Sequence, residues 1–435
     1  MRAFTVGKPS RRRARWRIAA AGGVVLALAA AGCSSSGSGS SGGSGNGKVT
    51  ITELDYFTSS GGNTALNWYN KKFEQEHPGV TVKRTAVSFA NLITKVLQDA
   101  SAGDMPSLVL LDNPNVAQVA ATGQLRAFND LPGFTTSGYY PGAIKECTYQ
   151  GKQYCYPIGT NSVGLFYNKA MLKAAGLQPP TTWDELAADA KKLTKPPVYG
   201  MAFDATADEQ STWQLEPFFW SNGASLSKVD TPAFQQALQL WVNMVKDGSA
   251  SKSVLNWGQS PDLTQQFTQG RAAMMVNGPW IFPDLNAKGW KYNQEYGIVP
   301  IPTDKPGQTV IAPLGGETVD LGNSGSDEQK KLAWEWVQGM QQPDVMTHVT
   351  SLMYYLPTKP AVTDQVLKGG PEYTVFAKET QTARPRTTEY GANYPKVSQA
   401  IWTAIQAAIT GTSSVSSALQ TAQGTISGVQ QVSGG

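Results

Sequence analysis

The sequence predicts an α/β protein built from two domains. Its 435 residues are many for a single hydrophobic core and suit two. Hydrophobic residues make up 40% of the chain and charged residues 16%, so apolar material for packed cores is ample. Short segments with a strand pattern alternate with segments of helical spacing, and this alternation favours a parallel sheet. Ligands of such sheets bind at the carboxyl ends of the strands.

The strands are predicted from short runs of apolar and β-branched residues, and the helices from apolar residues three or four positions apart. Turn residues separate them: Pro78-Gly79 ends the first helix and Gly123 ends the third. One further helix begins after Thr182, which has the capping-box spacing with Glu185. Strands are expected at 48–56, 80–87, 107–111, 163–167, 200–203, 272–276, 296–302 and 318–321, and helices at 64–77, 89–102, 116–122, 327–341 and 394–409.

Two loops at predicted strand ends offer polar groups to a ligand. The loop from Phe57 to Asn63, which includes Ser59, Ser60 and Gly61, is rich in hydroxyls and free backbone N–H groups. The second loop is Asp112-Asn113-Pro114. Asp112 suits either of two roles, a ligand acceptor or a helix N-cap, and its spacing favours neither.

The segment 268–280 predicts a rigidly held aromatic face. A buried-strand pattern at 272–276 is ended by Asn277-Gly278-Pro279, and Trp280 follows at once. Proline fixes its own φ and glycine permits an unusual one, so the indole stands on stiff backbone. Such a face can stack on the C–H face of a sugar ring, and the competing interpretation is a Trp packed in the core.

A second group of aromatic residues lies within 213–223, which reads W-Q-L-E-P-F-F-W-S-N-G. Four aromatic side chains within eight residues surround one carboxylate, Glu216. A single buried helix face needs fewer aromatics than this. Phe218 and Trp220 are therefore further candidates for ligand contact.

The N-terminal segment has the pattern of an export signal. Basic residues at 2–17 precede an apolar run at 18–31, which is short for a membrane span and suits a secretory signal. Cys33 follows, and then a nearly pure Ser/Gly tract to 47 that behaves as a flexible tether. Residues 1–32 hold seven Lys and Arg and no acidic residue, so their removal lowers the net charge from +4 to −3. That balance argues against a nucleic-acid partner.

The remaining cysteines and the histidines limit the chemistry. Cys147 and Cys155 lie eight residues apart, and in an exported protein this spacing favours a disulfide over two free thiols. Only two histidines are present, too few for a His-rich metal site or for His-based catalysis. No phosphate-binding G-x-x-x-x-G-K-S/T motif occurs. We expect no metal and no cofactor.

Several short motifs occur in order along the chain. Leu28 to Cys33 resembles a lipoprotein signal, with Ala30 where leucine is usual. The other motifs are Leu165-Phe166-Tyr167-Asn168-Lys169, Thr182-Trp183-Asp184-Glu185-Leu186, Phe218 to Gly223, Gly270-Arg271-Ala272-Ala273-Met274, Gly278-Pro279-Trp280, Gly315-Gly316 and Leu356-Pro357-Thr358. In their order and spacing they resemble the motifs of the extracellular solute-binding proteins of family 1, the sugar-binding lipoproteins of ABC importers, of which maltose-binding protein is a relative.

The resemblance implies a two-lobed periplasmic-binding-protein fold, similar to class II, that closes on its ligand like a flytrap. Hinge segments cross between the lobes. The implied divisions are a lipoprotein signal peptide at 1–32, a lipidated Cys33 with its tether at 33–47, lobe 1 at 48–157 plus 308–342, and lobe 2 at 158–307 plus 343–430.

The resemblance also implies a function, which is capture of a sugar, of di- or oligosaccharide size, for delivery to an ABC permease. The protein would be a monomer without enzymatic activity, anchored by lipid to the outer face of the bacterial cell membrane. The ligand-binding residues expected from loops, motifs and resemblance together are Phe57, Ser59, Ser60, Gly61, Asp112, Asn113, Glu216, Phe218, Trp220, Trp280, Gly315, Gly316, Glu317, Tyr354, Tyr355 and Arg386. Asp112, Asn113, Glu216 and Arg386 would pair with ligand hydroxyls.

Two other functions stay open at this stage. A secreted glycoside hydrolase also needs aromatics and a carboxylate pair, for which Glu216 with Asp112 or with Glu317 is available. No local catalytic motif marks either pair. A binding protein for a peptide, a polyamine or iron is the second alternative, and Tyr354-Tyr355 is the one hint of an iron site.

Overall fold

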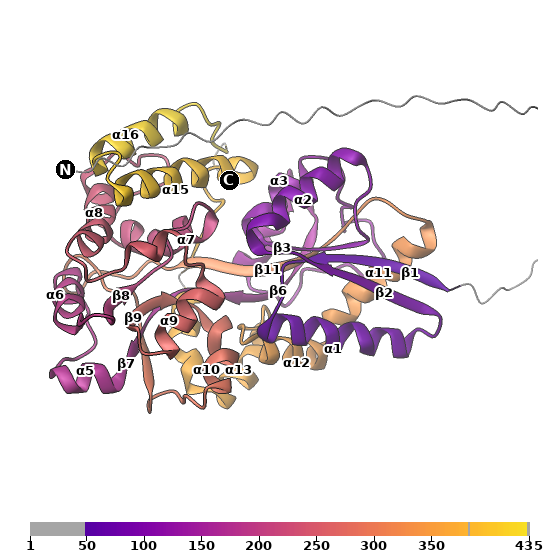
Figure 1. Ribbon diagram of the computed structural model, residues 1–435. Coiled ribbons are helices and arrows are strands. Elements are labelled where there is room, and N and C mark those ends of the chain that lie inside the picture. Colours follow the sequence, from indigo (N-terminus) through magenta and orange to yellow (C-terminus); the bar gives the residue numbers. More distant parts are fainter. Residues whose placement is uncertain (1–47, 382, 433–435) are drawn as a thin grey trace, which may run out of the picture. The chain divides into compact units, whose positions relative to one another are not determined.

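The computed structural model describes residues 48–381 and 383–432, which form two large β-sheets, with helices packed on both faces of each, and one two-stranded sheet (Figure 1). The expected signal segment, Cys33 and the Ser/Gly tether lie outside the described residues. Strand β1 is Val49–Asp55, followed by helix α1, Ser60–Glu76. Helix α1 thus begins four residues earlier than the expected start at 64. Ser60 to Asn63 form its first turn and are not loop, which corrects the prediction for this segment.

The first sheet has the order β12-β11-β3-β1-β2, and β6 pairs with β11 as well. Strand β1 is parallel to β2 and β3, as expected, whereas β11 runs antiparallel to both β3 and β6. The sheet is therefore mixed, because β11 enters it from a distant part of the chain. The further strands are β2 (Val80–Ala86), β3 (Leu108–Asp112), β6 (Cys155–Asn161), β11 (Pro313–Leu321) and β12 (Arg384–Pro385).

The second sheet has the order β10-β7-β9-β8. Its strands β8 and β9 are parallel, and β7 is antiparallel to both β9 and β10. The strands are β7 (Gly164–Asn168), β8 (Tyr199–Ala202), β9 (Ala272–Asn277) and β10 (Tyr296–Val299). All four lie within one residue of a predicted strand at their starts, although β10 ends before the prolines that follow it.

The helices begin and end where the local sequence dictates. Helix α6 has the predicted capping box, in which the Thr182 hydroxyl accepts from the Glu185 N–H and the Glu185 carboxylate accepts from the Thr182 N–H. Beyond α1, the helices are α2 (Phe89–Ala102), α3 (Val116–Ala120), α4 (Pro141–Glu146), α5 (Lys169–Ala175), α6 (Trp183–Leu193), α7 (Glu209–Ser221), α8 (Pro232–Lys246), α9 (Thr264–Thr268), α10 (Phe282–Ala287), α11 (Asp327–Met340), α12 (Pro343–Met353), α13 (Pro360–Gly369), α14 (Thr374–Thr380), α15 (Tyr394–Thr410) and α16 (Val415–Ile426).

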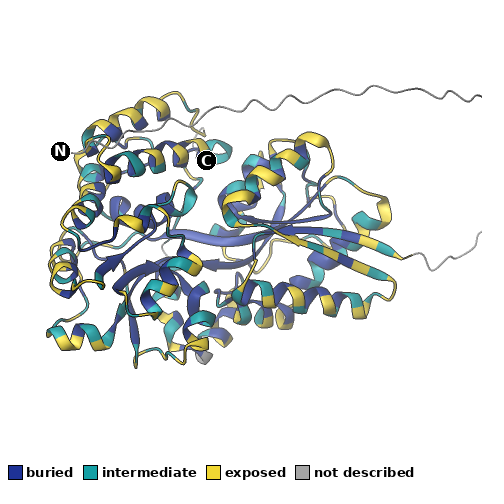
Figure 2. Ribbon diagram, viewed as in Figure 1, coloured by how far each residue is buried: buried dark blue, intermediate teal, exposed yellow. Residues whose placement is uncertain are grey.

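Each large sheet separates two apolar clusters, because alternate side chains of a strand point to opposite faces. Strands β3, β6 and β11 are buried along their whole length (Figure 2). In the first sheet Leu108 and Leu110 join one cluster, and Val109 and Leu111 join the other. In the second sheet Leu165 and Met201 join one cluster, and Phe166 and Ala202 join the other. The apolar residues therefore gather in four clusters, two around each sheet.

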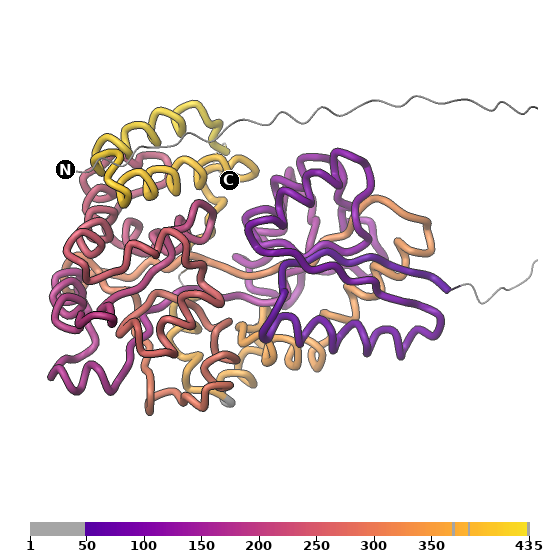
Figure 3. The backbone as a smooth tube through the Cα atoms, in the orientation of Figure 1, coloured from indigo at the N-terminus to yellow at the C-terminus, as the bar shows by residue number. Residues whose placement is uncertain are grey.

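Helix α12 departs from the predicted division of the chain. It packs along α1, and its Val345, Met346 and Val349 belong to a core cluster of the first sheet (Figure 3). Residues from 343 were expected in lobe 2. The correction follows from the pattern of α12, whose apolar side continues the surface that α11 presents to α1.

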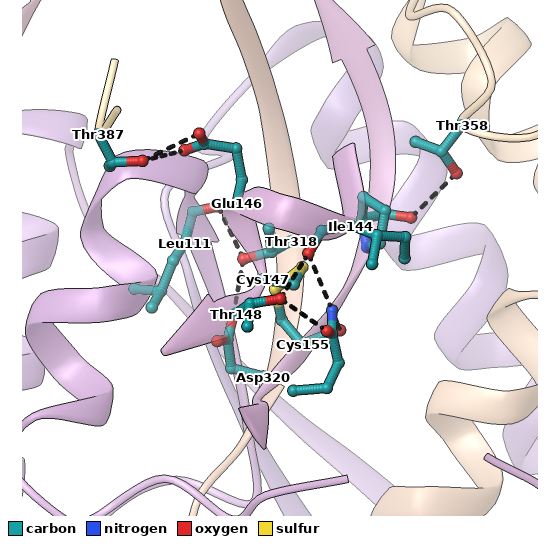
Figure 4. The surroundings of a disulfide bond; sticks show 12 residues. Leu111, Ile144, Glu146, Cys147, Thr148, Cys155, Thr318, Asp320, Thr358 and Thr387 are labelled. Carbon is teal, nitrogen blue, oxygen red and sulfur yellow. Dashed lines mark hydrogen bonds between the residues drawn. A yellow bond between two sulfur atoms is a disulfide. The ribbon is translucent and has the colours of Figure 1, made fainter. Parts of the chain in front are cut away.

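A disulfide joins Cys147 and Cys155, as expected, and closes a loop that carries the short strands β4 (Thr148–Tyr149) and β5 (Lys152–Gln153). Both cysteines are fully buried in the cluster under α2 and α3. Figure 4 shows the bond beside Thr318, whose hydroxyl donates to Asp320 at 2.7 Å. The bond therefore fixes the edge of the first sheet and lies apart from the pocket described below.

Candidate functional site

A pocket of about 330 Å³ lies within the folded body. The loop after β1, the start of α1, the end of β3, the first turns of α7, and single residues of β11 and of the segment after α12 all contribute to it. A second pocket, of about 680 Å³, shares Ser59, Ser60, Gly61, Ser260 and Pro261 with it. The lining residues are Tyr56, Phe57, Thr58, Ser59, Ser60, Gly61, Gly62, Ser88, Phe89, Asp112, Asn161, Glu209, Gln210, Trp213, Gln259, Ser260, Pro261, Trp280, Glu317, Met353, Tyr355 and Arg386.

Trp280 lines this pocket from a 3₁₀ turn, Pro279–Ile281, that follows β9. Its ring is half-buried and packs against three of the four apolar clusters. The ring also lies directly over Gly278, where a Cβ would come within 2.0 Å of the ring atom Cζ3. Glycine is needed here for space and not for φ, which is −125°. Trp280 is thus rigidly placed, and its contact with a ligand stays a prediction.

Trp213 is a second aromatic wall, from helix α7. The Arg386 guanidinium carbon lies 4.5 Å from its ring centroid, so one side of the indole carries a cation. A Cβ on Gly315 would come within 2.4 Å of the Trp213 ring atom Cη2. Gly315 therefore makes room for this ring, whereas it was expected to approach the ligand with its own backbone.

Arg386 is the centre of a buried charge network. Its Nη1 donates to Asp112 Oδ2 at 2.9 Å and to Glu209 Oε1 at 2.8 Å. Its Nη2 donates to Asp112 Oδ1 and to Asn113 Oδ1, both at 2.5 Å. The side chain is only 2% exposed. The Asp112 side chain accepts no capping bond and so does not serve as an N-cap. Each of its two oxygens accepts one bond from Arg386, and a contact between Asp112 and a ligand stays a prediction.

Glu317 holds a second network from the middle of β11. Its Oε1 accepts from the hydroxyls of Tyr56 and Tyr355, the latter at 2.9 Å, and its Oε2 accepts from Asn161 Nδ2 at 3.4 Å. Burial raises the pKa of Glu317 to about 8, an effect that these hydrogen bonds only partly oppose. One carboxyl group thus joins two pocket-lining tyrosines from distant segments of the chain.

Three predicted site residues lie away from the pocket. Glu216, Phe218 and Trp220 are each at most 1% exposed and none lines it, so the expectation that they face the cleft is wrong. The reason is the orientation of α7, which turns these residues toward α8 and α15. Glu216 accepts from the Tyr394 hydroxyl at 2.9 Å, and burial raises its pKa well above the usual range.

Other predicted residues lie beside the first pocket or in the lining of the second. Asn113 contacts Arg386 but does not line the pocket, and Gly316 packs on the Gly159 carbonyl, 2.2 Å from the place of a Cβ. Both expectations of direct ligand contact are therefore corrected. Tyr354 lines the second pocket, next to α10. The predicted residues that the pocket does bring together are Phe57, Ser59, Ser60, Gly61, Asp112, Trp280, Glu317, Tyr355 and Arg386.

Sequence reasoning missed several lining residues. Glu209, Gln210 and Trp213 lie at positions i, i+1 and i+4 of α7, and so share one face of the helix. The sequence shows that spacing. The aromatic residues that follow Glu216 are denser, however, and the predicted ligand contacts were therefore placed one to two helical turns too close to the C-terminal end of α7. Tyr56, Phe89, Asn161 and Gln259 carried no local signal, because the fold alone brings them together.

The arrangement suits a ligand with flat apolar faces and hydroxyl-bearing edges. Aromatic rings supply the faces, and carboxylates, amides and hydroxyls supply the edges. Within the described ranges, no group of three or more His, Cys, Asp or Glu side chains is arranged to hold a metal ion. Nor does any helix of these ranges have the length and apolar character that crossing a bilayer requires.

The chain is similar to known binding proteins along most of its length. A putative binding protein of Brucella abortus is 25% identical over 320 residues, which is 71% of this chain and 76% of the relative. The maltotriose-binding protein of Pyrococcus abyssi is 24% identical over 71% of this chain and 66% of its own.

Solved structures agree with the fold. A solute-binding protein of an ABC transporter from Thermotoga lettingae, bound with α-D-tagatose, superposes with a TM-score of 0.78 at 25% identity, over 87% of this chain and 98% of the other. MalE3 of T. maritima, bound to maltose, has a TM-score of 0.80 at 23% identity, over 87% and 99%. The fold is accordingly the two-lobed α/β fold of maltose-binding-protein-type binding proteins. The family model "bacterial extracellular solute-binding protein" matches residues 68–383, and the chain therefore belongs to that family, whose members act outside the cytoplasm.

Proposed function

We propose that this protein is the sugar-binding subunit of an ABC importer, and that the pocket holds a sugar of di- or oligosaccharide size. The observation that carries the proposal is the pair of fixed indoles, Trp280 and Trp213, which line one pocket together with buried carboxylates. Sugar rings need this combination, because their C–H faces are apolar and their edges bear hydroxyls. The relatives bound to maltose and to tagatose support the same ligand class.

The two lobes of the proposal follow the two sheets. Lobe 1 comprises 48–157, 308–342 and, after the correction, helix α12; lobe 2 comprises 158–307 and the remainder to 430. A ligand that contacts both lobes binds the closed state more tightly than the open state, and this difference in affinity sets how far the ligand shifts the equilibrium toward closure. Capture without chemistry is the mechanism, and closure is what a permease would recognise.

The proposal includes a membrane anchor. Cys33 becomes the lipidated N-terminus after removal of 1–32, and the Ser/Gly tract to 47 tethers a monomeric body to the outer face of the cell membrane. Incorporation of labelled palmitate into the expressed chain, and its loss in Cys33→Ser, tests this part. An unlabelled wild-type chain would contradict it.

Calorimetry on the protein lacking residues 1–33 tests the ligand. Mono-, di- and oligosaccharides are titrated in turn, and each sugar that binds should also raise the melting temperature by mass action. Trp280→Ala is the matched variant, which should lose sugar binding and retain its unfolding transition. A panel in which only peptides, polyamines or iron bind would refute the sugar assignment.

We infer that the hydrolase alternative is the weaker one. Both carboxylate pairs named for it contain Glu216, which is fully buried and outside the pocket lining, and this weighs against that alternative. We therefore expect no release of aryl leaving groups from aryl glycosides by the purified protein. A measurable rate that purification does not remove would overturn the transport assignment.

A further inference from the structure

Four ionisable acidic or basic side chains line the pocket, and their partners define which ligand charges it can accept. Among the described residues of the lining, three are carboxyl groups, Asp112, Glu209 and Glu317, and one is a cation, Arg386. No lysine or histidine of the described chain joins them. A ligand carboxylate or phosphate would therefore depend on Arg386 for its counter-charge.

Arg386 has almost nothing left to offer such a ligand. A guanidinium has five N–H donors, and four of these are committed: two to Asp112, one to Asn113 and one to Glu209. The fifth donor, on Nε, is buried and has no partner in the described structure. One face of the group also lies over the Trp213 ring. An incoming anion would have to displace a buried carboxylate to form the usual paired contact.

The carboxyl groups of the pocket are fixed in the same way. Glu209 accepts from Arg386, from the Tyr394 hydroxyl at 2.7 Å and from the Ser398 hydroxyl. Glu317 accepts from two tyrosines and an asparagine, as described above. These bonds keep the acidic groups at the pocket wall. Burial raises the pKa of Glu317 to about 8, so this carboxyl is largely uncharged at neutral pH. The carboxylates of Asp112 and Glu209 are therefore the groups that repel a ligand anion at short range.

The N-terminus of helix α1 opposes this repulsion, because it attracts a ligand anion. The first turn of α1, Ser60 to Gly62, lines the pocket, and the leading N–H groups of a helix carry a partial positive charge. That charge amounts to about half an elementary charge. It is smaller than the excess of one negative charge that the carboxylates of Asp112 and Glu209 have over Arg386. Neutral hydroxyl oxygens can use the same N–H groups.

We propose that the pocket selects uncharged or cationic sugars, such as neutral oligosaccharides and amino sugars, and excludes sugars that carry a carboxylate or a phosphate. The inference rests on the proposed sugar-binding function and narrows it. Arg386 is then a positioning residue that braces Trp213 and Asp112, and it does not contact the ligand as an ion-pairing group.

A capture experiment with mixed sugars tests this selection. Protein lacking residues 1–33 is immobilised and exposed to a pooled partial hydrolysate of starch, cellulose, xylan, chitosan and pectin, and the retained molecules are identified by mass spectrometry. Neutral or amino oligosaccharides should be retained, and uronic-acid oligomers should be depleted at least tenfold, or by about 1.4 kcal/mol. Retention of uronic-acid oligomers would overturn the selection and leave sugar binding intact. Retention of nothing would instead refute the proposed function itself.

A charge variant tests the cause. Asp112→Asn removes one negative charge beside Arg386, so the acidic share of the retained sugars should rise. Glu146→Gln is the matched control, because Glu146 is a buried carboxyl that accepts from Thr387, next to Arg386, and lies outside the pocket lining. An unchanged acidic share in Asp112→Asn, with neutral sugars still retained, would refute the electrostatic explanation. If that variant does not fold, Glu209→Gln removes the equivalent charge from the other side of Arg386.

Discussion

Replacing Gly278 with alanine tests the role of Trp280 without removing the indole. The added Cβ would lie 2.0 Å from Cζ3 and 2.2 Å from Cη2 of the Trp280 ring. Ordinary carbon–carbon contact is about 3.5 Å, so the ring must move by about 1.5 Å. The backbone at Gly278 has φ −125° and ψ −177°, which alanine adopts freely, so the clash with the ring is the whole perturbation.

The expected magnitude follows from two terms. Displacing a central stacking ring should weaken binding by about 1–3 kcal/mol, which is roughly five- to 150-fold in Kd. Overpacking the turn should lower the free energy of unfolding by about 1–3 kcal/mol, which leaves a folded protein. Calorimetry with a sugar that binds the wild type measures the first term, and urea unfolding measures the second.

Gly297→Ala is the matched control. Its Cβ would lie 2.2 Å from Cζ of the Tyr167 ring, and neither residue lines the pocket. It should therefore cost a similar amount of stability and leave sugar affinity unchanged. Wild-type affinity in a folded Gly278→Ala would refute the stacking role of Trp280, and an equal loss in both variants would show that general strain and not ring position reduces binding.

Three further outcomes are expected. Trp213→Leu should weaken sugar binding at least tenfold in calorimetry, by about 1.4 kcal/mol. Trp220 is fully buried outside the pocket, so Trp220→Phe should lower the free energy of unfolding and leave Kd unchanged. The reverse pattern would support the prediction from the sequence that Trp220 contacts the ligand. Burial raises the pKa of Glu317 from 4.5 to about 8, so its proton stabilises the folded state fully below about pH 4.5 and less and less as the pH rises through 8. Urea unfolding across this range should show a smaller decline for Glu317→Gln than for the wild type, and an identical decline would contradict the assignment. Replacing both Cys147 and Cys155 with serine should lower the free energy of unfolding by about 2–3 kcal/mol, as expected for a short closed loop. Sugar affinity should not change. A loss of sugar affinity would show that the disulfide contributes to the binding site.

The fold was largely predictable, because strand and helix patterns are local. The strand at 107–111 and the capping box at Thr182 depend on neighbouring residues, and both were expected within a residue of their observed positions. The assignment of α12 to the wrong lobe has a different origin. The apolar pattern of α12 is compatible with the core of either lobe. Only its packing against α1 shows that it belongs to the core of the first sheet.

The site was predictable only in part. Trp280 and the Phe57 loop could be found because glycine, proline and strand ends mark such positions in the sequence. Trp213 shares a helix face with Glu209 and Gln210, and the sequence does show that spacing. Its place in the pocket, however, depends on Arg386 and Gly315, which lie more than 100 residues away along the chain. Arg386 shows a second limit: its charge suggested a ligand contact, and only the bonds to Asp112 and Glu209 reveal that its donors are occupied.

The position of β11 has a consequence for biosynthesis. This strand lies between β3 and β6 in the first sheet, although about 200 residues of chain separate the end of β3 from the end of β11 (Figure 1). At 5–20 residues per second, a ribosome needs roughly 10–40 s to supply them. During that interval β3 presents an unpaired edge, and the first lobe cannot complete its sheet. A chain made in this order stays incompletely folded until most of it has been synthesised, and its exposed β3 edge is the segment that a chaperone would have to protect.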